Sequence, residues 1–173
     1  MDIFLNKDIK GKILDIGGGG EGIIGRLYKN QVVAIDNRQE ELDEAPDLFE
    51  KRLMDAEKLD FPDFCFDAVT AFYSFMFMST NTRRKAAVEM VRVLKNGGEI
   101  HIWDAKIPDA EKSPFCVDLK IFLPEETINT AYGIMGTGLE QSFNATKKIF
   151  EDLGLVCDKQ MESENNFYLK FKK

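Results

Sequence analysis

The chain has 173 residues, the length of one domain, and 44% of them are hydrophobic and 31% charged, as in an ordinary globular protein rather than a disordered or fibrous one. Its net charge of −7 disfavours a general binder of nucleic acid or of an anionic membrane, because attraction to phosphate requires a cationic surface. Three widely spaced cysteines, a single histidine and no signal-peptide pattern predict a cytoplasmic protein without a metal site or a disulfide framework.

Short apolar runs alternate with amphipathic stretches over the first two thirds of the sequence. The apolar runs predict strands at residues 12–16, 31–36, 51–54, 66–72 and 99–105. The amphipathic stretches predict helices at residues 21–29, 38–49 and 82–94. Leu42 and Leu48 are expected to face inward from the second helix, and Asn96-Gly97-Gly98 is expected to end the third. The alternation implies right-handed crossovers and a largely parallel, doubly wound α/β sheet with helices on both faces.

The last third of the sequence has a different composition. Residues 106–141 are rich in Pro, Gly and Thr, with candidate strands near 115–123 and 127–135. A helix at 142–153 and strands at 155–161 and 166–171 follow. The separation of these two strands is of hairpin length, so the sheet is expected to end with an antiparallel pair. Because no linker or repeat is visible, we expect residues 1–173 to form one domain, with 106–141 as an insertion that contacts substrate or acts as a lid.

The most informative stretch is ILDIGGGGEGIIGRL, which combines a strand, a glycine turn and the start of a helix. Gly17, Gly19 and Gly22 satisfy the pattern G-x-G-x-x-G, which in this context is typical of nucleotide binding. Glycines suit such a turn because the chain bends sharply and because a Cβ atom would keep a ligand away from the backbone. The pattern alone does not distinguish between nucleotide cofactors.

Acidic residues at the ends of three predicted strands narrow the choice of cofactor. Asp36 ends the second strand, where a carboxylate can accept hydrogen bonds from both hydroxyls of a ribose. Asp15 would repel a pyrophosphate but suits a ligand with an ammonium group. Asp55 can accept from an exocyclic amine, and the backbone at Ala56 can donate to a ring nitrogen. These partners fit S-adenosylmethionine better than NAD.

With these residues identified, the sequence resembles the class I S-adenosylmethionine-dependent methyltransferases over residues 12–105. The resemblance rests on LDIGGGGEG, the acidic end of VVAID, DAEKLDFPDFCFDAV and RVLKNGGEIHIWD, in that order. It implies a seven-stranded sheet of order 3-2-1-4-5-7-6 whose last strand is antiparallel. It also implies S-adenosylmethionine as the cofactor and S-adenosylhomocysteine as its product.

The resemblance assigns site residues as follows. It implies that Asp15 and the backbone of Gly17 and Gly19 hold the methionine moiety, that Asp36 binds the ribose, that Asp55 and Ala56 bind the adenine edge, and that the backbone around Phe72 binds the amino group. The sequence departs from the family at Glu21, which occupies the third glycine position, and at Asn37, where a bulky aliphatic residue is common. The short segment before the first strand predicts an open site, or one closed by residues 106–141 or by a partner chain.

The catalytic residues are unknown from the sequence, with Tyr73 and Asp104 as candidates because each follows or ends a predicted strand near the expected cleft. Phe75, Phe77 and Met78 are expected in the core. Two other expectations are that His101 is structural and that the run Arg83-Arg84-Lys85 lies on a solvated helix face.

The sequence thus predicts an enzyme that transfers a methyl group from S-adenosylmethionine to a small-molecule acceptor by in-line displacement. No Asn/Asp-Pro-Pro-Tyr or Pro-Cys motif is present in the expected cleft segment, which disfavours methylation of DNA bases. Two alternatives stay open: a non-catalytic S-adenosylmethionine-binding protein, and a NAD-dependent oxidoreductase, which Asp15 and the short chain disfavour. We expect neither nucleic acid nor a membrane as partner, and leave a homo-oligomer open.

Overall fold

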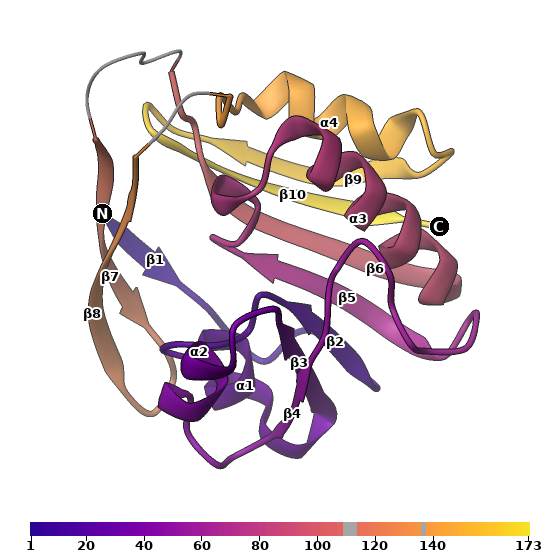
Figure 1. Ribbon diagram of the computed structural model, residues 1–173, viewed down its shortest axis with the longest axis horizontal. Helices are drawn as coiled ribbons and strands as arrows, with labels where there is room; N and C mark the ends of the chain where they lie inside the picture. The colour runs from indigo at the N-terminus through magenta and orange to yellow at the C-terminus, as the bar shows by residue number, and fades with distance from the viewer. Residues whose placement is uncertain (109–113, 136–137) are drawn as a thin grey trace.

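A seven-stranded sheet forms the centre of the computed structural model, which describes residues 1–108, 114–135 and 138–173 (Figure 1). Its strands, in spatial order, are β4 (Glu50–Leu53), β3 (Val32–Asp36), β2 (Ile13–Ile16), β5 (Phe66–Phe72), β6 (Leu94–Ala105), β10 (Asn166–Lys172) and β9 (Val156–Glu162). The first five are parallel, and β10 is antiparallel to both of its neighbours. When only these strands are numbered along the chain, the order is 3-2-1-4-5-7-6, so the predicted fold class is confirmed.

The two faces of the sheet are covered differently. Helices α3 (Thr80–Val93) and α4 (Phe143–Glu151) pack on one face, where Met90 and Phe150 are fully buried (Figure 1). Helix α1 (Ile23–Tyr28) packs on the other face, and α2 (Gln39–Glu44) lies beside β3 and β4. Two short 3-10 turns, η1 (Lys29–Gln31) and η2 (Phe75–Phe77), follow α1 and β5.

A second, three-stranded sheet shares the face of α1 and is seen at the left of Figure 1. It consists of β1 (Asp2–Phe4), β7 (Phe115–Phe122) and β8 (Thr127–Ile134) in that spatial order. In β7, Val117, Leu119 and Ile121 are buried while the residues between them are exposed, as the two-residue period of a half-buried strand requires. The predicted insertion therefore contributes two strands, β7 and β8, to this sheet, and residues 109–113 and 136–137 of it lie outside the described residues.

The glycine pair after α3 does not cap that helix, contrary to the sequence prediction. Helix α3 ends at Val93, and β6 begins at the next residue, Leu94. Gly97 has a φ of 77° within β6, where the register with β5 shifts. A Cβ atom at Gly98 would lie 2.8 Å from the carbonyl oxygen of Asp67. The glycines therefore allow a bulge in the strand, a feature that a glycine pair favours as readily as a helix end.

Two other local predictions are wrong for identifiable reasons. Helix α2 ends at Glu44 rather than near residue 49, because Ala45 precedes Pro46 and is extended, and Leu48 is consequently exposed. Arg83 is buried rather than solvated. Its guanidinium donates to the carbonyl oxygens of Phe75 (2.9 Å), Glu140 (2.7 Å) and Leu139 (2.9 Å). It thus joins α3 to the segment that precedes α4.

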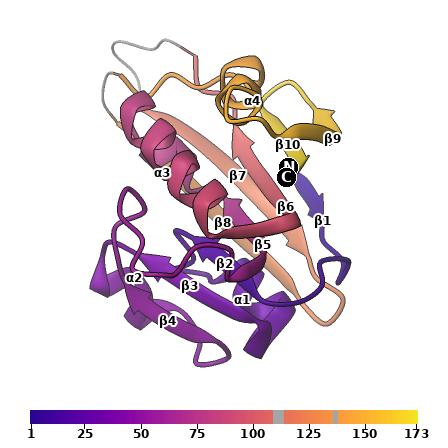
Figure 2. The ribbon, with the colours of Figure 1, turned by 90° about the vertical axis from the view of Figure 1, so that its right-hand side faces the viewer.

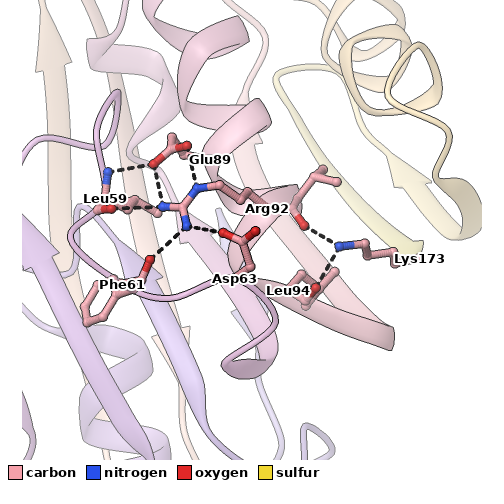
Figure 3. A network of polar contacts seen from close by, with 8 residues as sticks. Leu59, Phe61, Asp63, Glu89, Arg92, Leu94 and Lys173 are labelled. Carbon is pink, nitrogen blue, oxygen red and sulfur yellow. Dashed lines mark hydrogen bonds and ion pairs between the residues drawn. The ribbon is translucent and has the colours of Figure 1, made fainter.

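A second arginine of α3 holds the long loop between β4 and β5 (Figure 3). The guanidinium of Arg92 donates to Glu89, to Asp63 (2.7 Å) and to the carbonyl oxygens of Leu59 (2.9 Å) and Phe61 (2.8 Å). Glu89 in turn accepts from the Leu59 backbone N–H at 2.8 Å. This network restrains the loop that carries the predicted adenine-binding residues at its other end. Figure 2 shows the loop running beside α3.

The described helices are also too short or too polar to cross a lipid bilayer: none of them combines the length and the apolar composition that a membrane span requires.

Candidate functional site

A cavity of about 990 Å³ opens at the carboxyl ends of β2, β3 and β5, which is where open α/β sheets generally bind ligands. Its walls are the glycine-rich turn after β2, the end of β3, the start of the loop after β4, the segment after β5 and part of β8. The cofactor residues predicted from the sequence all line it: Asp15, Gly17, Gly19, Asp36, Asp55, Ala56 and Phe72.

The glycine-rich turn packs tightly against acidic side chains. The N–H groups of Gly17 and Gly18 both donate to the carbonyl oxygen of Ile35 in β3, at 2.8 and 3.0 Å. A Cβ atom on Gly18 would lie 2.5 Å from Asp15 Oδ2, and one on Gly19 would lie 3.0 Å from Asp36 Oδ2. The glycines are therefore needed for the carboxylates to approach the backbone, and not only for the bend.

Asp15 is buried at the inner end of the cavity. Its Oδ1 accepts a hydrogen bond of 2.6 Å from the Thr70 hydroxyl. Burial raises the pKa of Asp15 to about 7, the Thr70 hydrogen bond opposes this rise, and the nearby Asp36 adds to it. Near neutral pH, a cationic group beside Asp15 would therefore favour its ionised form.

Asp36 and Asp55 occupy more open parts of the same cavity. Asp36 is half-buried at the end of β3, where its Oδ1 accepts from the Arg38 N–H at 3.0 Å; burial raises its pKa above the ordinary value. Asp55 is exposed, and its Oδ1 accepts from the Glu57 N–H at 2.9 Å. Asp15, Asp36 and Asp55 thus surround one hollow, as the sequence interpretation requires.

The chain leaves β5 through a strained residue. Tyr73 has a φ of 51°, in the left-handed region that non-glycine residues seldom adopt. Its N–H donates to the Trp103 carbonyl oxygen at 2.8 Å, and its hydroxyl donates to Asn166 Oδ1 at 2.6 Å. Burial raises the pKa of Tyr73 above its usual value, which argues against this phenol as a general base. The next residue, Ser74, lines the cavity with a buried hydroxyl that has no hydrogen-bond partner in the described part of the chain.

These groups fit S-adenosylmethionine. A carboxylate at the end of β3 suits ribose hydroxyls, a buried carboxylate beside the glycine turn suits an ammonium, and the Ser74 hydroxyl lacks a partner. The glycines of the turn allow the carboxylates of Asp15 and Asp36 to lie close to its backbone. A family model described as a methyltransferase domain matches residues 14–102, slightly more than half of the chain. The chain belongs to the methyltransferase domain family.

This membership confirms the predicted family, the class I S-adenosylmethionine-dependent methyltransferases, and its cofactor. A phosphatidylethanolamine N-methyltransferase from Cereibacter sphaeroides is 35% identical over 103 residues, which cover 53% of this chain and 49% of that protein. The chain therefore spans about half the length of the curated relative it matches.

Two solved structures share the fold at low sequence identity. A SAM-dependent methyltransferase from Aquifex aeolicus has a TM-score of 0.65 at 20% identity, with 93% of this chain and 81% of that chain covered. The N-methyltransferase NodS from Bradyrhizobium japonicum, in complex with S-adenosyl-L-homocysteine, has a TM-score of 0.63 at 14% identity, with 94% and 78% covered. These likenesses show that the fold is shared.

In this chain, Asp104 does not face the cavity, contrary to the sequence expectation. Its side chain is fully buried and accepts hydrogen bonds from the N–H groups of Ala105 (2.7 Å) and Met76 (3.3 Å) and from Gln141 Nε2 (2.8 Å). Burial raises its pKa to about 7. Asp104 thus ties the end of β6 to η2 and to the far end of the 106–141 segment, and it does not reach the cavity wall.

The aromatic residues after β5 divide between core and cavity. Phe75 is fully buried against Phe150, as expected. Phe77 is 51% exposed and lines the cavity, so the expectation that it belongs to the core is wrong. The physical reason is the 3-10 turn η2, whose tight winding turns Phe77 away from the sheet. Met78 is partly buried and packs against the core, and it also lines the cavity.

The sequence analysis expected residues 106–141 to contact substrate or close the site, but it named none of the β8 residues that line the cavity. Tyr132 is one of them, and its hydroxyl donates to Glu21 Oε2 at 3.0 Å; the Thr130 hydroxyl donates to Glu21 Oε1. Glu21 therefore joins the glycine-rich turn to the three-stranded sheet. The presence of glutamate instead of glycine at position 21 already indicated in the sequence that this residue is unusual. The residues that bind the Glu21 side chain could be identified only from the fold.

Proposed function

We propose that this protein transfers a methyl group from S-adenosylmethionine to a small-molecule acceptor. One observation carries the proposal: Asp15, Asp36 and Asp55, from three separate strand ends, line a single cavity beside the glycine-rich turn in a chain of the methyltransferase domain family. The half-length match to a phosphatidylethanolamine N-methyltransferase leaves the acceptor open.

The proposed roles of the binding residues follow from their positions. Asp15, with the backbone of Gly17 and Gly19, would hold the methionine part of the cofactor, and Asp36 would accept hydrogen bonds from the ribose hydroxyls. Asp55 and Ala56 would hold the adenine edge. The backbone at Phe72 would hold the amino group of the cofactor. When bound, S-adenosylmethionine supplies a sulfonium methyl group that passes to an acceptor lone pair, while the electron pair of the broken carbon–sulfur bond stays on sulfur.

On the acceptor side, the chain's task is to position the nucleophile, because holding the reacting atoms in line about 3–3.5 Å apart removes much of the barrier. Tyr73, Phe77 and Tyr132 line the cavity, and we propose that they flank the acceptor. We propose that residues 1–173 act as one domain in which the 106–141 segment covers the site. We further propose that the protein works in the cytoplasm and needs neither nucleic acid nor a membrane.

A thermal-shift experiment tests cofactor binding. At 100 times its dissociation constant, S-adenosylhomocysteine should stabilise the fold by about 2.7 kcal/mol, which corresponds to a rise in Tm of roughly 5–10 °C for a chain of this length. NAD should give no such rise. Asp36→Ala should abolish most of the shift because it removes the ribose acceptor, whereas Asp60→Ala, an exposed acidic residue outside the cavity, should retain it.

Methyl transfer is then tested with labelled cofactor and a fractionated metabolite extract, in which a labelled small molecule should appear with the wild-type protein and not with Asp36→Ala. A normal S-adenosylhomocysteine shift without any labelled product would indicate a non-catalytic binder, and a shift with NAD alone would indicate an oxidoreductase.

A further inference from the structure

Glu21 is a carboxylate of the cavity wall whose side-chain oxygens form no ion pair within the described chain, although the Arg26 guanidinium donates through Nε to the backbone carbonyl oxygen of Glu21 at 2.6 Å. Two other lining glutamates do form ion pairs, since Glu41 pairs with Arg38 at 2.8 Å and Glu57 pairs with Lys85 at 2.7 Å. Both hydrogen-bond donors to Glu21 are neutral hydroxyls, from Thr130 and Tyr132. The one cation bonded to this residue, Arg26, contacts its carbonyl oxygen and pairs with Glu126 at 3.2 Å, so the carboxylate itself has only hydroxyl donors among the described residues.

Aromatic rings form the wall beside this carboxylate. The rings of Phe77 and Tyr132 meet at 86° with their centroids 6.4 Å apart, so they form two sides of a corner. Tyr73 extends the wall, with its ring centroid 5.6 Å from that of Tyr132. All three residues line the cavity.

Phe77 and Tyr132 offer ring surface rather than hydroxyls to a ligand, whereas Tyr73 is buried and supports the Tyr132 ring. The Tyr132 hydroxyl is donated to Glu21 and the Tyr73 hydroxyl to Asn166, and Phe77 has none. Phe77 is also half exposed, although burying a phenyl ring is worth roughly 1.5–3 kcal/mol. A half-exposed ring in the wall of a cavity indicates a surface that a ligand covers.

Ring faces next to an unpaired carboxylate select for cations. The negative face of an aromatic ring attracts an ammonium group, and the carboxylate adds charge and hydrogen-bond acceptors. The same corner disfavours an anionic acceptor, because the carboxylate would repel it, and offers a neutral alcohol little beyond apolar contact.

We propose that the acceptor of this methyltransferase is an amine, bound as its ammonium ion in the corner that Glu21, Phe77 and Tyr132 form. The proposal rests on the function proposed above and names its substrate class. Before transfer, the bound ammonium ion loses one proton to water, which frees the nitrogen lone pair. The lone pair then bonds to the methyl carbon while the carbon–sulfur electron pair stays on sulfur, so substrate and product carry the same positive charge. The corner therefore suits both.

Calorimetric titration of the protein saturated with S-adenosylhomocysteine tests the proposal without any turnover. The probes are hexylamine, which is a cation at neutral pH, and hexan-1-ol, which has the same chain and no charge. Hexylamine should bind at least about tenfold more tightly than hexan-1-ol. Glu21→Gln should reduce this preference about tenfold, and Phe77→Leu should also reduce it, because the exposed ring contributes the cation–π contact.

Glu57→Gln is the matched control, because it removes a carboxylate of the same cavity that already has a cationic partner; it should leave the preference unchanged. The affinity of Glu21→Gln for S-adenosylhomocysteine should stay within about twofold of wild type, which shows that the variant is folded. Equal binding of the two probes, or an unchanged preference in both Glu21→Gln and Phe77→Leu, would overturn the proposal. If wild-type protein fails to bind S-adenosylhomocysteine, the proposed function is wrong, and the probe preference measured without it still decides whether the corner binds amines.

Discussion

Asp15 and Asp104 are both buried carboxyl groups whose pKa is raised to about 7 by burial, but their oxygen atoms have different partners. Asp104 accepts three hydrogen bonds and lies behind the cavity wall, where it holds the end of β6. Asp15 accepts from the Thr70 hydroxyl and lines the cavity beside Gly18. At the scale of single residues, therefore, cavity access rather than pKa distinguishes a ligand-binding carboxylate from a structural one.

The pKa of Asp15 leads to opposite pH dependences for stability and for binding. The pKa of Asp15 is higher in the folded chain than the unfolded value of 3.8, so the protonated carboxyl group favours the folded state. This contribution to the free energy of unfolding is fully present below pH 3.8 and is lost as the pH rises to about 7. The ammonium of S-adenosylhomocysteine, by contrast, favours ionised Asp15. We therefore expect its affinity to rise about tenfold from about pH 6 to about pH 8.

Calorimetry across this pH range checks the prediction with Asp15→Asn, which should flatten the profile, and with Asp60→Asn, which should retain it. An Asp15→Asn profile as steep as that of wild type would mean that another group near the cavity titrates.

At the scale of elements, the glycine-rich turn requires glycine at position 18 because a side chain would not fit there, and not because the backbone adopts a conformation that only glycine allows. Gly18 has no positive φ, yet a Cβ atom there would meet both Asp15 Oδ2 (2.5 Å) and the Ala34 side chain (2.8 Å). Both neighbours belong to the central strands β2 and β3, which the sheet prevents from moving apart. The turn is thus clamped between the two strands that carry Asp15 and Asp36.

Gly18→Ala should consequently lower the free energy of unfolding by about 1–3 kcal/mol and weaken S-adenosylhomocysteine binding, since overpacking displaces Asp15. Gly133→Ala in β8 is the matched control, because its Cβ atom would meet only the Phe115 carbonyl oxygen at 3.7 Å; its effect should stay within about 0.5 kcal/mol. Urea unfolding measures both variants. A Gly18→Ala protein as stable as the control would show that the turn can move away from β2 and β3.

At the scale of the whole molecule, the three-stranded sheet occupies the face of the central sheet that α1 shares, and it reaches the cavity through β8 (Figure 1). Strand β1 pairs in parallel with β7, and β7 pairs with β8. The first residues of the chain therefore support the cavity wall through β7. The hydrogen bonds of Glu21 connect this sheet to the glycine-rich turn. Glu21 is therefore the point at which the glycine-rich turn is hydrogen-bonded to β8 of the three-stranded sheet.

This connection predicts where ligand binding slows hydrogen exchange. S-adenosylhomocysteine should protect the amides of β8 around Tyr132, because a ligand that contacts the glycine-rich turn also stabilises the partners of Glu21. The edge strand β9, which lies at the far end of the large sheet, should show no change. Hydrogen–deuterium exchange with mass spectrometry checks both. Protection confined to the glycine-rich turn, with none in β8, would contradict a cover coupled to the cofactor site.

The sequence by itself determined the central sheet and the positions of Asp15, Asp36 and Asp55 at the carboxyl ends of its strands. The strands could be predicted because apolar periodicity is a local property of the sequence. Right-handed crossovers make these strands parallel, so their carboxyl ends lie at the same edge of the sheet. The antiparallel end of the sheet followed equally from the short spacing between β9 and β10.

Only the tertiary structure decided which of the other polar and aromatic side chains reach the cavity. Glu21 and Tyr132 are 111 residues apart in the chain, so no local pattern could pair them. Arg83 is buried because it meets the carbonyl oxygen of Glu140, 57 residues away, and Asp104 turns inward because Gln141 lies beside it. In each case, a polar or aromatic group is buried because folding brings a hydrogen-bond partner from a distant segment. The spacing of residues in the sequence predicts only contacts between neighbours along the chain.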